Sequence, residues 1–388
     1  MISENSIIHD GDYTILQKVG GEQLRPCRLL NGQRALIEKL SFDPKDAFGK
    51  PYGVFEVGSN GKTLDTVDFS KETYQPIPDE SILMQNGNNT MESFKERSHF
   101  SKEKYLRKMT KKHSVKVMIS RPTIRLLCLS YFNKDPERLA HLRFGQLSLL
   151  LQLLNIHSCG CNVFVYENTL GLLGAAVMER LDNQGNCIFL HRGDWPQSIP
   201  CIDAMNNYCR DNFLPLRITT FLQPDILKNE EESDQLKIQR RQSHSQEIQD
   251  DGKNISTIDV GNLNESDSSL QSLLERRAER RKKEKRALDV LLKNSTEGNE
   301  VLNEGKLDGI LLAGRTFDTV DVLKQVIDGL RLSGSVVVYS PIKQHILKAW
   351  NFLRSTNSFI DMQIQEQFCR TYQILPNQTH PLMQQPVI

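Results

Sequence analysis

The sequence has neither a long hydrophobic run nor a cysteine framework. No stretch of its 388 residues approaches the ~20 consecutive apolar residues that a membrane-spanning helix needs. The eight cysteines are scattered, and most lie in apolar segments, which is typical of reduced core thiols. The first residues lack the basic and apolar regions of a signal peptide. We therefore expect a soluble intracellular protein that does not bind a membrane.

Familiar catalytic and metal-binding spacings are also missing. The nine histidines are scattered without a paired spacing, and there is neither a Gly-x-Ser-x-Gly elbow nor a complete phosphate-binding loop. Cys159 and Cys161 have no second Cys/His pair at the spacing of a zinc finger. These absences predict no catalytic residues and no metal site.

Residues 1–86 predict a β-rich N-terminal domain. Short apolar runs alternate there with turn dipeptides of the hairpin type, namely Gly20-Gly21, Asn31-Gly32 and Asn60-Gly61. We expect an antiparallel, barrel-like domain. The alternative is an irregular extension that docks on the main domain.

Residues 87–121 predict a basic helical linker. From residue 102 to residue 121 the chain has eight cations and a single acid, Glu103. Such a run forms either a solvated face or a surface for phosphate groups, and its local excess of one sign suits the second role. The cations are Lys102, Lys104, Arg107, Lys108, Lys111, Lys112, Lys116 and Arg121.

Residues 122–388 alternate strand and helix patterns, which predicts a parallel sheet and an α/β fold. The order fits the Rossmann-like class I methyltransferase fold. Residues 225–303 interrupt it with a polar insertion that we expect to be disordered. Within it, residues 273–288 favour a solvated helix, an RNA-contacting arm or a nuclear-import signal. The expected strands are 163–166, 187–191, 214–221, 307–313 and 334–340, followed by a terminal hairpin of 359–365 and 372–375.

The segment 163–174 resembles a nucleotide-binding loop that has lost most of its glycines. An apolar strand runs into Glu167, and a helix begins near Gly171, where nucleotide-binding folds place glycines so that backbone can approach the ligand. Gly174 lies one residue late, and Thr169 and Leu173 place side chains where a ligand would lie. The pattern predicts a degenerate cofactor site and no bound cofactor.

Two further features of a methyl-donor site are absent. The expected strand 187–191 ends in His191-Arg192 and not in the carboxylate that would hold a ribose. The expected strand 307–313 leads into Arg315, a permanent cation that suits phosphate and would repel a sulfonium. A catalytically silent homologue is the favoured interpretation. The alternative is an active S-adenosylmethionine-dependent RNA methyltransferase with an unusual loop.

Several segments resemble one known family. They are residues 100–108, residues 131–136, the loop 167–174 and the tail 370–381 with its Tyr-Gln-Ile-Leu-Pro and Thr-His-Pro motifs. Together they resemble the non-catalytic, tRNA-binding subunit of the eukaryotic tRNA (adenine-58-N1) methyltransferase. The resemblance runs in patches from residue 48 to residue 383. Asn377 and Gln378 depart from it where the family often has a cation.

The resemblance implies a chain that binds tRNA but no cofactor. It implies a catalytic methyltransferase subunit as partner, in a nuclear heterotetramer with two copies of each chain. The basic segment 102–121, Arg143 and Arg315 are the implied tRNA contacts. A structural subunit that does not touch RNA is a third hypothesis.

Overall fold

The computed structural model describes residues 7–58, 60–67, 101–102, 115–196, 199–205, 210–236, 257–291, 306–370, 372–373 and 379–381. The chain forms two compact units. The first contains residues 1–136, 203–206 and 361–388, and the second contains residues 137–202 and 207–360. None of the described helices combines the length and the apolar character needed to cross a membrane.

The first unit is built on an antiparallel sheet of order β2-β1-β7-β5-β6, which confirms the predicted antiparallel β-structure in this part of the chain. Its strands are β1 (Tyr13–Lys18), β2 (Leu24–Arg28), β5 (Gly53–Val57), β6 (Leu64–Thr66) and β7 (Lys116–Ser120). A separate hairpin joins β3 (Ala35–Ile37) to β4 (Leu40–Phe42). The predicted turn dipeptides all lie between strands.

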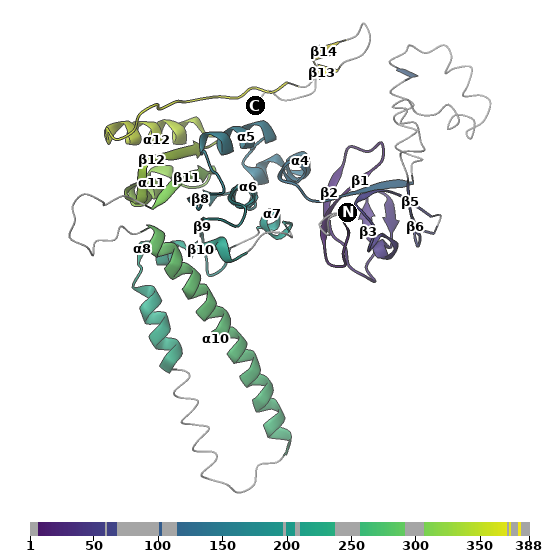
Figure 1. Cartoon of the computed structure of the whole chain (residues 1–388), viewed down its shortest axis with the longest axis horizontal. Coiled ribbons are helices and arrows are strands. Elements are labelled where there is room, and N and C mark those ends of the chain that lie inside the picture. The colour runs from purple at the N-terminus through teal and green to yellow at the C-terminus, as the bar shows by residue number, and fades with distance from the viewer. Residues whose placement is uncertain are drawn as a thin grey trace. The chain divides into compact units, whose positions relative to one another are not determined.

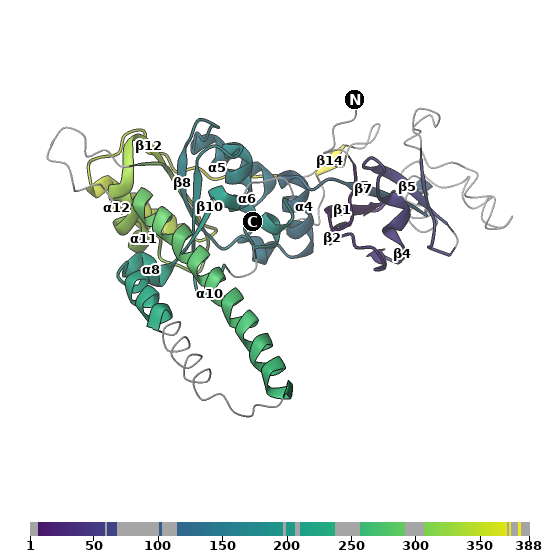
Figure 2. The same ribbon diagram turned by 60° about the horizontal axis from the view of Figure 1, so that its bottom comes forward.

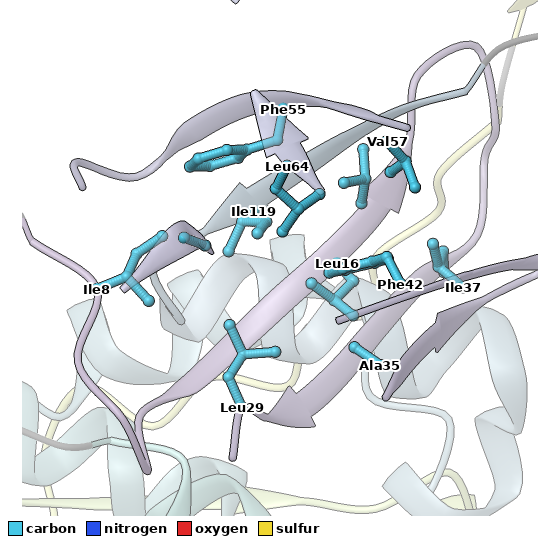
Figure 3. Packing of buried hydrophobic residues seen from close by; sticks show 12 residues of the cluster. Ile8, Leu16, Leu29, Ala35, Ile37, Phe42, Phe55, Val57, Leu64 and Ile119 are labelled. Carbon is cyan, nitrogen blue, oxygen red and sulfur yellow. The ribbon is translucent and has the colours of Figure 1, made fainter. Parts of the chain in front are cut away.

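The core of this unit lies between the sheet and the β3–β4 hairpin. Side chains from different strands point toward one another there, including Leu16 of β1, Phe42 of β4, Phe55 of β5 and Ile119 of β7, all fully buried (Figure 3). The alternation of apolar and polar residues along each strand produces this single buried face.

The end of the predicted basic linker is corrected by the structure. Lys116–Ser120 is not helical but forms β7, the central strand of the first sheet. Val117 and Ile119 alternate with more exposed neighbours and are fully buried, so the period of two in their burial outweighs the local charge. Most of the predicted linker, 87–100 and 103–114, lies outside the described residues.

Helix α4 (Ile124–Lys134) follows β7 in the same unit. It begins at Thr123, whose hydroxyl accepts a hydrogen bond from the backbone N–H of Leu126 at 3.3 Å. On the buried side of α4, the hydroxyl of Ser130 donates to the carbonyl of Leu24 in β2 at 3.1 Å. The helix is therefore fixed to the edge of the antiparallel sheet.

The second unit contains a parallel sheet of order β10-β9-β8-β11-β12, as expected for an α/β fold. Helices connect the strands (Figure 1). The strands are β8 (Asn162–Glu167), β9 (Asn186–His191), β10 (Phe213–Arg217), β11 (Leu307–Ala313) and β12 (Leu330–Tyr339). The helices are α5 (Phe144–Leu153), α6 (Leu172–Leu181), α7 (Pro200–Asp203), α8 (Ile218–Leu222), α10 (Thr257–Leu291), α11 (Thr319–Val326) and α12 (Lys343–Ser355), with the turn η3 (Pro136–Leu139) before α5.

Two strand predictions were wrong: the strand expected at 214–221 is shorter, and the terminal hairpin expected at 359–365 and 372–375 pairs different residues. Residues 218–221 continue the expected strand as helix α8. Residues 359–365 form no strand, and the terminal hairpin instead pairs β13 (Tyr372–Gln373) with β14 (His380–Pro381). Ile360 and Ile364 are exposed, so the alternation of apolar residues there has no packing surface that would turn it into a strand.

The predicted disorder of the insertion is also corrected. Residues 226–236 are helical and lie beside the long helix α10 in both views (Figures 1 and 2). Composition suggested disorder because few apolar residues are present, but ion pairs hold these two helices together: Arg277 and Arg281 both contact Asp234. We call residues 226–236 and 257–291 the helical arm.

Candidate functional site

The carboxyl ends of the parallel strands define the candidate site. The strand order reverses between β8 and β11, and doubly wound folds bind ligands outside the carboxyl ends of the strands at such a point. Here Asn168, directly after β8, donates its backbone N–H to the carbonyl of Ala313 at the end of β11 (2.9 Å). The hydroxyl of Thr316 donates to the side-chain oxygen of Asn168 at 2.7 Å. The two loops at the switch point are thus hydrogen-bonded to each other.

The N-terminus of α6 is occupied by the chain's own carboxylate. Glu167 accepts hydrogen bonds from the backbone N–H groups of Gly174 (2.7 Å) and Leu173 (3.2 Å), and from the hydroxyl of Thr169. In nucleotide-binding folds these first N–H groups of the helix face an anionic ligand. In this chain they face Glu167. Gly171 precedes α6 with φ of 76°, a left-handed conformation that glycine adopts without strain.

Burial changes the proton affinity of this carboxylate. Desolvation raises the pKa of Glu167 to about 7, against the lowering effect of the hydrogen bonds from Gly174, Leu173 and Thr169. The loop therefore contains an acid that titrates near neutral pH. Because burial causes this shift, the raised pKa depends on the enclosure of the Glu167 carboxylate by the loop.

The side chains of the loop point into the core. Thr169 and Leu173 are fully buried, so the structure places them inside the unit and not in an open mouth. The segment after residue 198 covers the loop: the N–H of Cys201 donates to the carbonyl of Leu170 at 3.2 Å. A Cβ added to Gly171 would lie 3.0 Å from the Cβ of Ile199. Sequence reasoning missed this cover, because nothing in the residue pattern connects 199–202 with 170–174.

Two aromatic side chains, one from β8 and one from the loop after β11, pack against each other. The rings of Tyr166 and Phe317 lie 4.2 Å apart between centroids. From the loop after β9, the Nε of Arg192 donates to the hydroxyl of Tyr166 at 3.3 Å. His191, the last residue of β9, is buried, and this burial lowers its pKa. The end of β9 therefore has a histidine and an arginine in place of a carboxylate, as the sequence indicated.

The predicted cation Arg315 follows β11 and is partly exposed. Its Nη2 lies 3.5 Å from a carboxylate oxygen of Glu137, in the turn that precedes Arg143. Arg143 is half-buried and stands at the start of helix α5, where its backbone N–H donates to the side-chain oxygen of Gln146 at 2.9 Å. Glu137 therefore neutralises part of the charge that Arg315 offers to a ligand.

The predicted basic segment falls mainly outside the described residues. This applies to Lys104, Arg107, Lys108, Lys111 and Lys112. Lys102 and Lys116 are half-buried, and Arg121 is exposed just after β7. Among the described residues no group of three or more histidine, cysteine, aspartate or glutamate side chains could hold a metal ion.

A buried cluster of charges at the end of β10 was not predicted. The guanidinium of Arg217 donates from Nε to Glu284 Oε1 (2.7 Å) and from Nη2 to Glu284 Oε2 (2.9 Å). Its Nη1 donates to Glu230 at 2.7 Å. Burial opposes the charge of Arg217, but these hydrogen bonds outweigh it and raise its pKa further. Because Glu230 and Glu284 belong to the helical arm, this cluster joins the arm to the sheet.

The order of the parallel strands and the loop at the switch point define the class of the fold. A parallel sheet of this order, with a strand, a loop and a glycine-started helix at the switch point, is a Rossmann-like fold. The model of the Gcd10p family matches residues 80–251 of the chain.

Curated relatives match far more of the chain than the family model does. The tRNA (adenine(58)-N(1))-methyltransferase non-catalytic subunit TRM6 of Mus musculus is 24% identical over 96% of this chain and 85% of its own length. The protein of the same name from Dictyostelium discoideum is 26% identical over 98% of this chain and 77% of its own length. Among solved structures, the tRNA (m1A58) methyltransferase TrmI from Aquifex aeolicus has a TM-score of 0.45 at 13% identity, covering 97% of this chain and 93% of that one.

Proposed function

We propose that this chain is the non-catalytic subunit of a tRNA (adenine-58-N1) methyltransferase and positions tRNA for a catalytic partner subunit. The observation that carries this proposal is the similarity of almost the whole chain to two proteins named as that subunit, from Mus musculus and Dictyostelium discoideum. The chain itself is not an enzyme in this proposal. A catalytic partner supplies the chemistry, and this subunit supplies binding energy for the RNA.

The degenerate cofactor site is part of the same proposal. Two observations support it. Glu167 accepts hydrogen bonds from the first N–H groups of α6, and the rings of Tyr166 and Phe317 pack against each other. Ile199 lies against Gly171, where a bound cofactor would need close approach to backbone. An active methyltransferase would have to displace these groups. We therefore prefer the non-catalytic function to that alternative.

The proposed tRNA contacts are cations, some in the first unit and some in the second. Adenine 58 must leave the folded tRNA before it can be methylated, and a cationic surface helps to hold the distorted RNA. The proposed contacts are Lys102, Lys104, Arg107, Lys108, Lys111, Lys112, Lys116, Arg121, Arg143 and Arg315. Arg121 and Arg315 have the best support, because both are exposed at the ends of strands.

The remaining expectations stay proposals. We propose a heterotetramer with two copies of each subunit, located in the nucleus, with an N-terminal domain that is barrel-like. The β3–β4 hairpin, which covers the core of the first sheet, supports the barrel-like form. The basic residues 276–286 of α10 are consistent with nuclear import.

Calorimetry with S-adenosylmethionine tests the central distinction. The purified chain is titrated alone and as a complex with its catalytic partner, and tRNA methylation is assayed in parallel. We expect saturable binding and methylation only for the complex. Micromolar binding by the chain alone, with methylation in the partner's absence, would establish the active-enzyme alternative.

A further inference from the structure

Trp195 is an exposed aromatic side chain in the loop after β9. It is 53% exposed and follows three charged or flexible residues, Arg192, Gly193 and Asp194. Single exposed apolar residues are common on protein surfaces, so exposure alone has no functional meaning. The Trp195 indole, however, contacts a buried cation that fixes its position.

Arg280 of the helical arm holds one face of the indole. Its Cζ lies 5.6 Å from the centroid of the Trp195 ring, within the range of a cation–π contact. The Arg280 side chain is 8% exposed, and its Nη2 donates to Glu230 at 2.9 Å. Its buried Nε has no hydrogen-bond partner among the described residues. The ion pair with Glu230 therefore positions Arg280 over the ring, while the Trp195 side chain as a whole stays 53% exposed.

The position of this indole coincides with a ligand-binding region of the fold. The loop lies at the carboxyl end of a parallel strand, outside which Rossmann-like folds bind ligands. In the same loop, Arg192 uses its Nε for the hydroxyl of Tyr166, and its two terminal nitrogens have no partner in the described part of the chain. Proteins bind single-stranded nucleic acid by stacking bases on aromatic side chains and contacting phosphates with cations. Trp195 and Arg192, three residues apart in this loop, are one residue of each kind.

We propose that Trp195 stacks on one unpaired base of the bound RNA, with Arg280 as the residue that positions the indole. This inference rests on the proposed function, since it takes tRNA as the ligand. RNA is favoured over a protein partner because the indole stands with the cation Arg192 at the carboxyl end of a parallel strand, where an aromatic face and a cation suit a base and its phosphate. The helical arm thereby takes part in RNA binding through Arg280, near the end of α10 that contacts the sheet.

Affinity measurements on the whole complex test the proposal. The complex of this chain with its catalytic partner is titrated with tRNA at several salt concentrations. Trp195→Ala is expected to weaken binding about ten-fold or more, with an unchanged salt slope, because stacking releases no counterions. Trp195→Phe keeps most of the affinity. Leu222→Ala, which removes an equally exposed side chain from the same unit, is the control and leaves the affinity unchanged.

Two further measurements separate the roles of the residues. Arg280→Met is expected to weaken tRNA binding in the wild-type background but to add little to Trp195→Ala, which identifies a positioning role. Ultraviolet crosslinking followed by peptide mapping is expected to place a nucleotide on Trp195.

The outcomes distinguish this proposal from the function on which it rests. If the wild-type complex fails to bind tRNA, the proposed function itself is wrong. If the wild type binds and Trp195→Ala binds equally well, only the stacking site is wrong. Weaker association of Trp195→Ala with the catalytic subunit, with tRNA affinity unchanged, would also overturn it and identify a protein contact.

Discussion

Arg217 and Glu284 lie 67 positions apart in the sequence and form a two-pronged ion pair inside the second unit. Arg217 ends β10, and Glu284 projects from α10 with no exposed surface. A guanidinium and a carboxylate in this parallel arrangement make the strongest kind of charged hydrogen bond. The pair is the joint between the sheet and the helical arm.

Removing the acid from this joint should destabilise the second unit. Glu284→Gln leaves a buried guanidinium with reduced compensation, and the loss of one partner from a buried pair costs about 3 kcal/mol or more. Urea denaturation should show the loss, and proteolysis within 226–291 should become faster. Lys348→Met is the matched control, because it breaks the exposed pair with Asp318 and should cost less than about 1 kcal/mol. Equal stability of the two variants would contradict a buried joint.

The enclosed acid of the loop should make stability depend on pH. Its ordinary pKa is 4.5 and its pKa in the folded chain is about 7, so between these values the folded state of Glu167 binds more protons than the unfolded state. The free energy of unfolding should therefore fall as pH rises from about 4.5 to about 7, and this contribution should be constant above that window. Urea denaturation at a series of pH values measures this slope.

Glu167→Gln is the control for the pH experiment. A neutral amide cannot titrate, so the variant should lose the part of the slope between pH 4.5 and pH 7 that belongs to Glu167. It should also be less stable at low pH, since the amide nitrogen that replaces one carboxyl oxygen cannot accept a hydrogen bond from the N–H of Leu173 or of Gly174. The same slope in both proteins would show that other groups cause the pH dependence.

Glu137 should restrain tRNA binding by Arg315. Because the two side chains form an ion pair across 3.5 Å, Glu137→Gln frees the guanidinium and should strengthen tRNA binding, whereas Arg315→Gln should weaken it. Filter binding at low and moderate salt measures both effects. If Glu137→Gln and Arg315→Gln bind tRNA like the wild type, Arg315 lies outside the interface.

The basic segment should contribute to the salt dependence of tRNA binding. Alanine at Lys108, Lys111 and Lys112 should make the plot of log affinity against log salt shallower, by up to about one unit for each phosphate group that the variant no longer binds. Alanine at the exposed Lys228, which lies on the helical arm beside Asp225, provides a comparison with a cation already paired. An unchanged slope in the triple variant would favour a structural subunit that does not touch RNA.

Patterns with a short period were sufficient to predict much of the fold. The apolar run from Val163 to Tyr166 predicted the central strand β8, and the turn dipeptides at Gly20, Asn31 and Asn60 predicted breaks between strands. These features are local, because side-chain alternation and turn geometry depend on a few consecutive residues. β7 was not predicted, because its five residues follow a long basic run that obscures the alternation of Val117 and Ile119.

The sequence by itself determined which chemical groups stand at the strand ends: Glu167 at the end of the first parallel strand, His191 and then Arg192 at the end of the second, and Arg315 after β11. Only the tertiary structure decided what those groups face. It turned Glu167 onto the N–H groups of α6, brought Ile199 over the loop, and paired Arg217 with Glu284. Composition assigned the insertion to disorder, because the pairing of its charges requires contacts between residues about 50 to 70 positions apart, which no local pattern encodes.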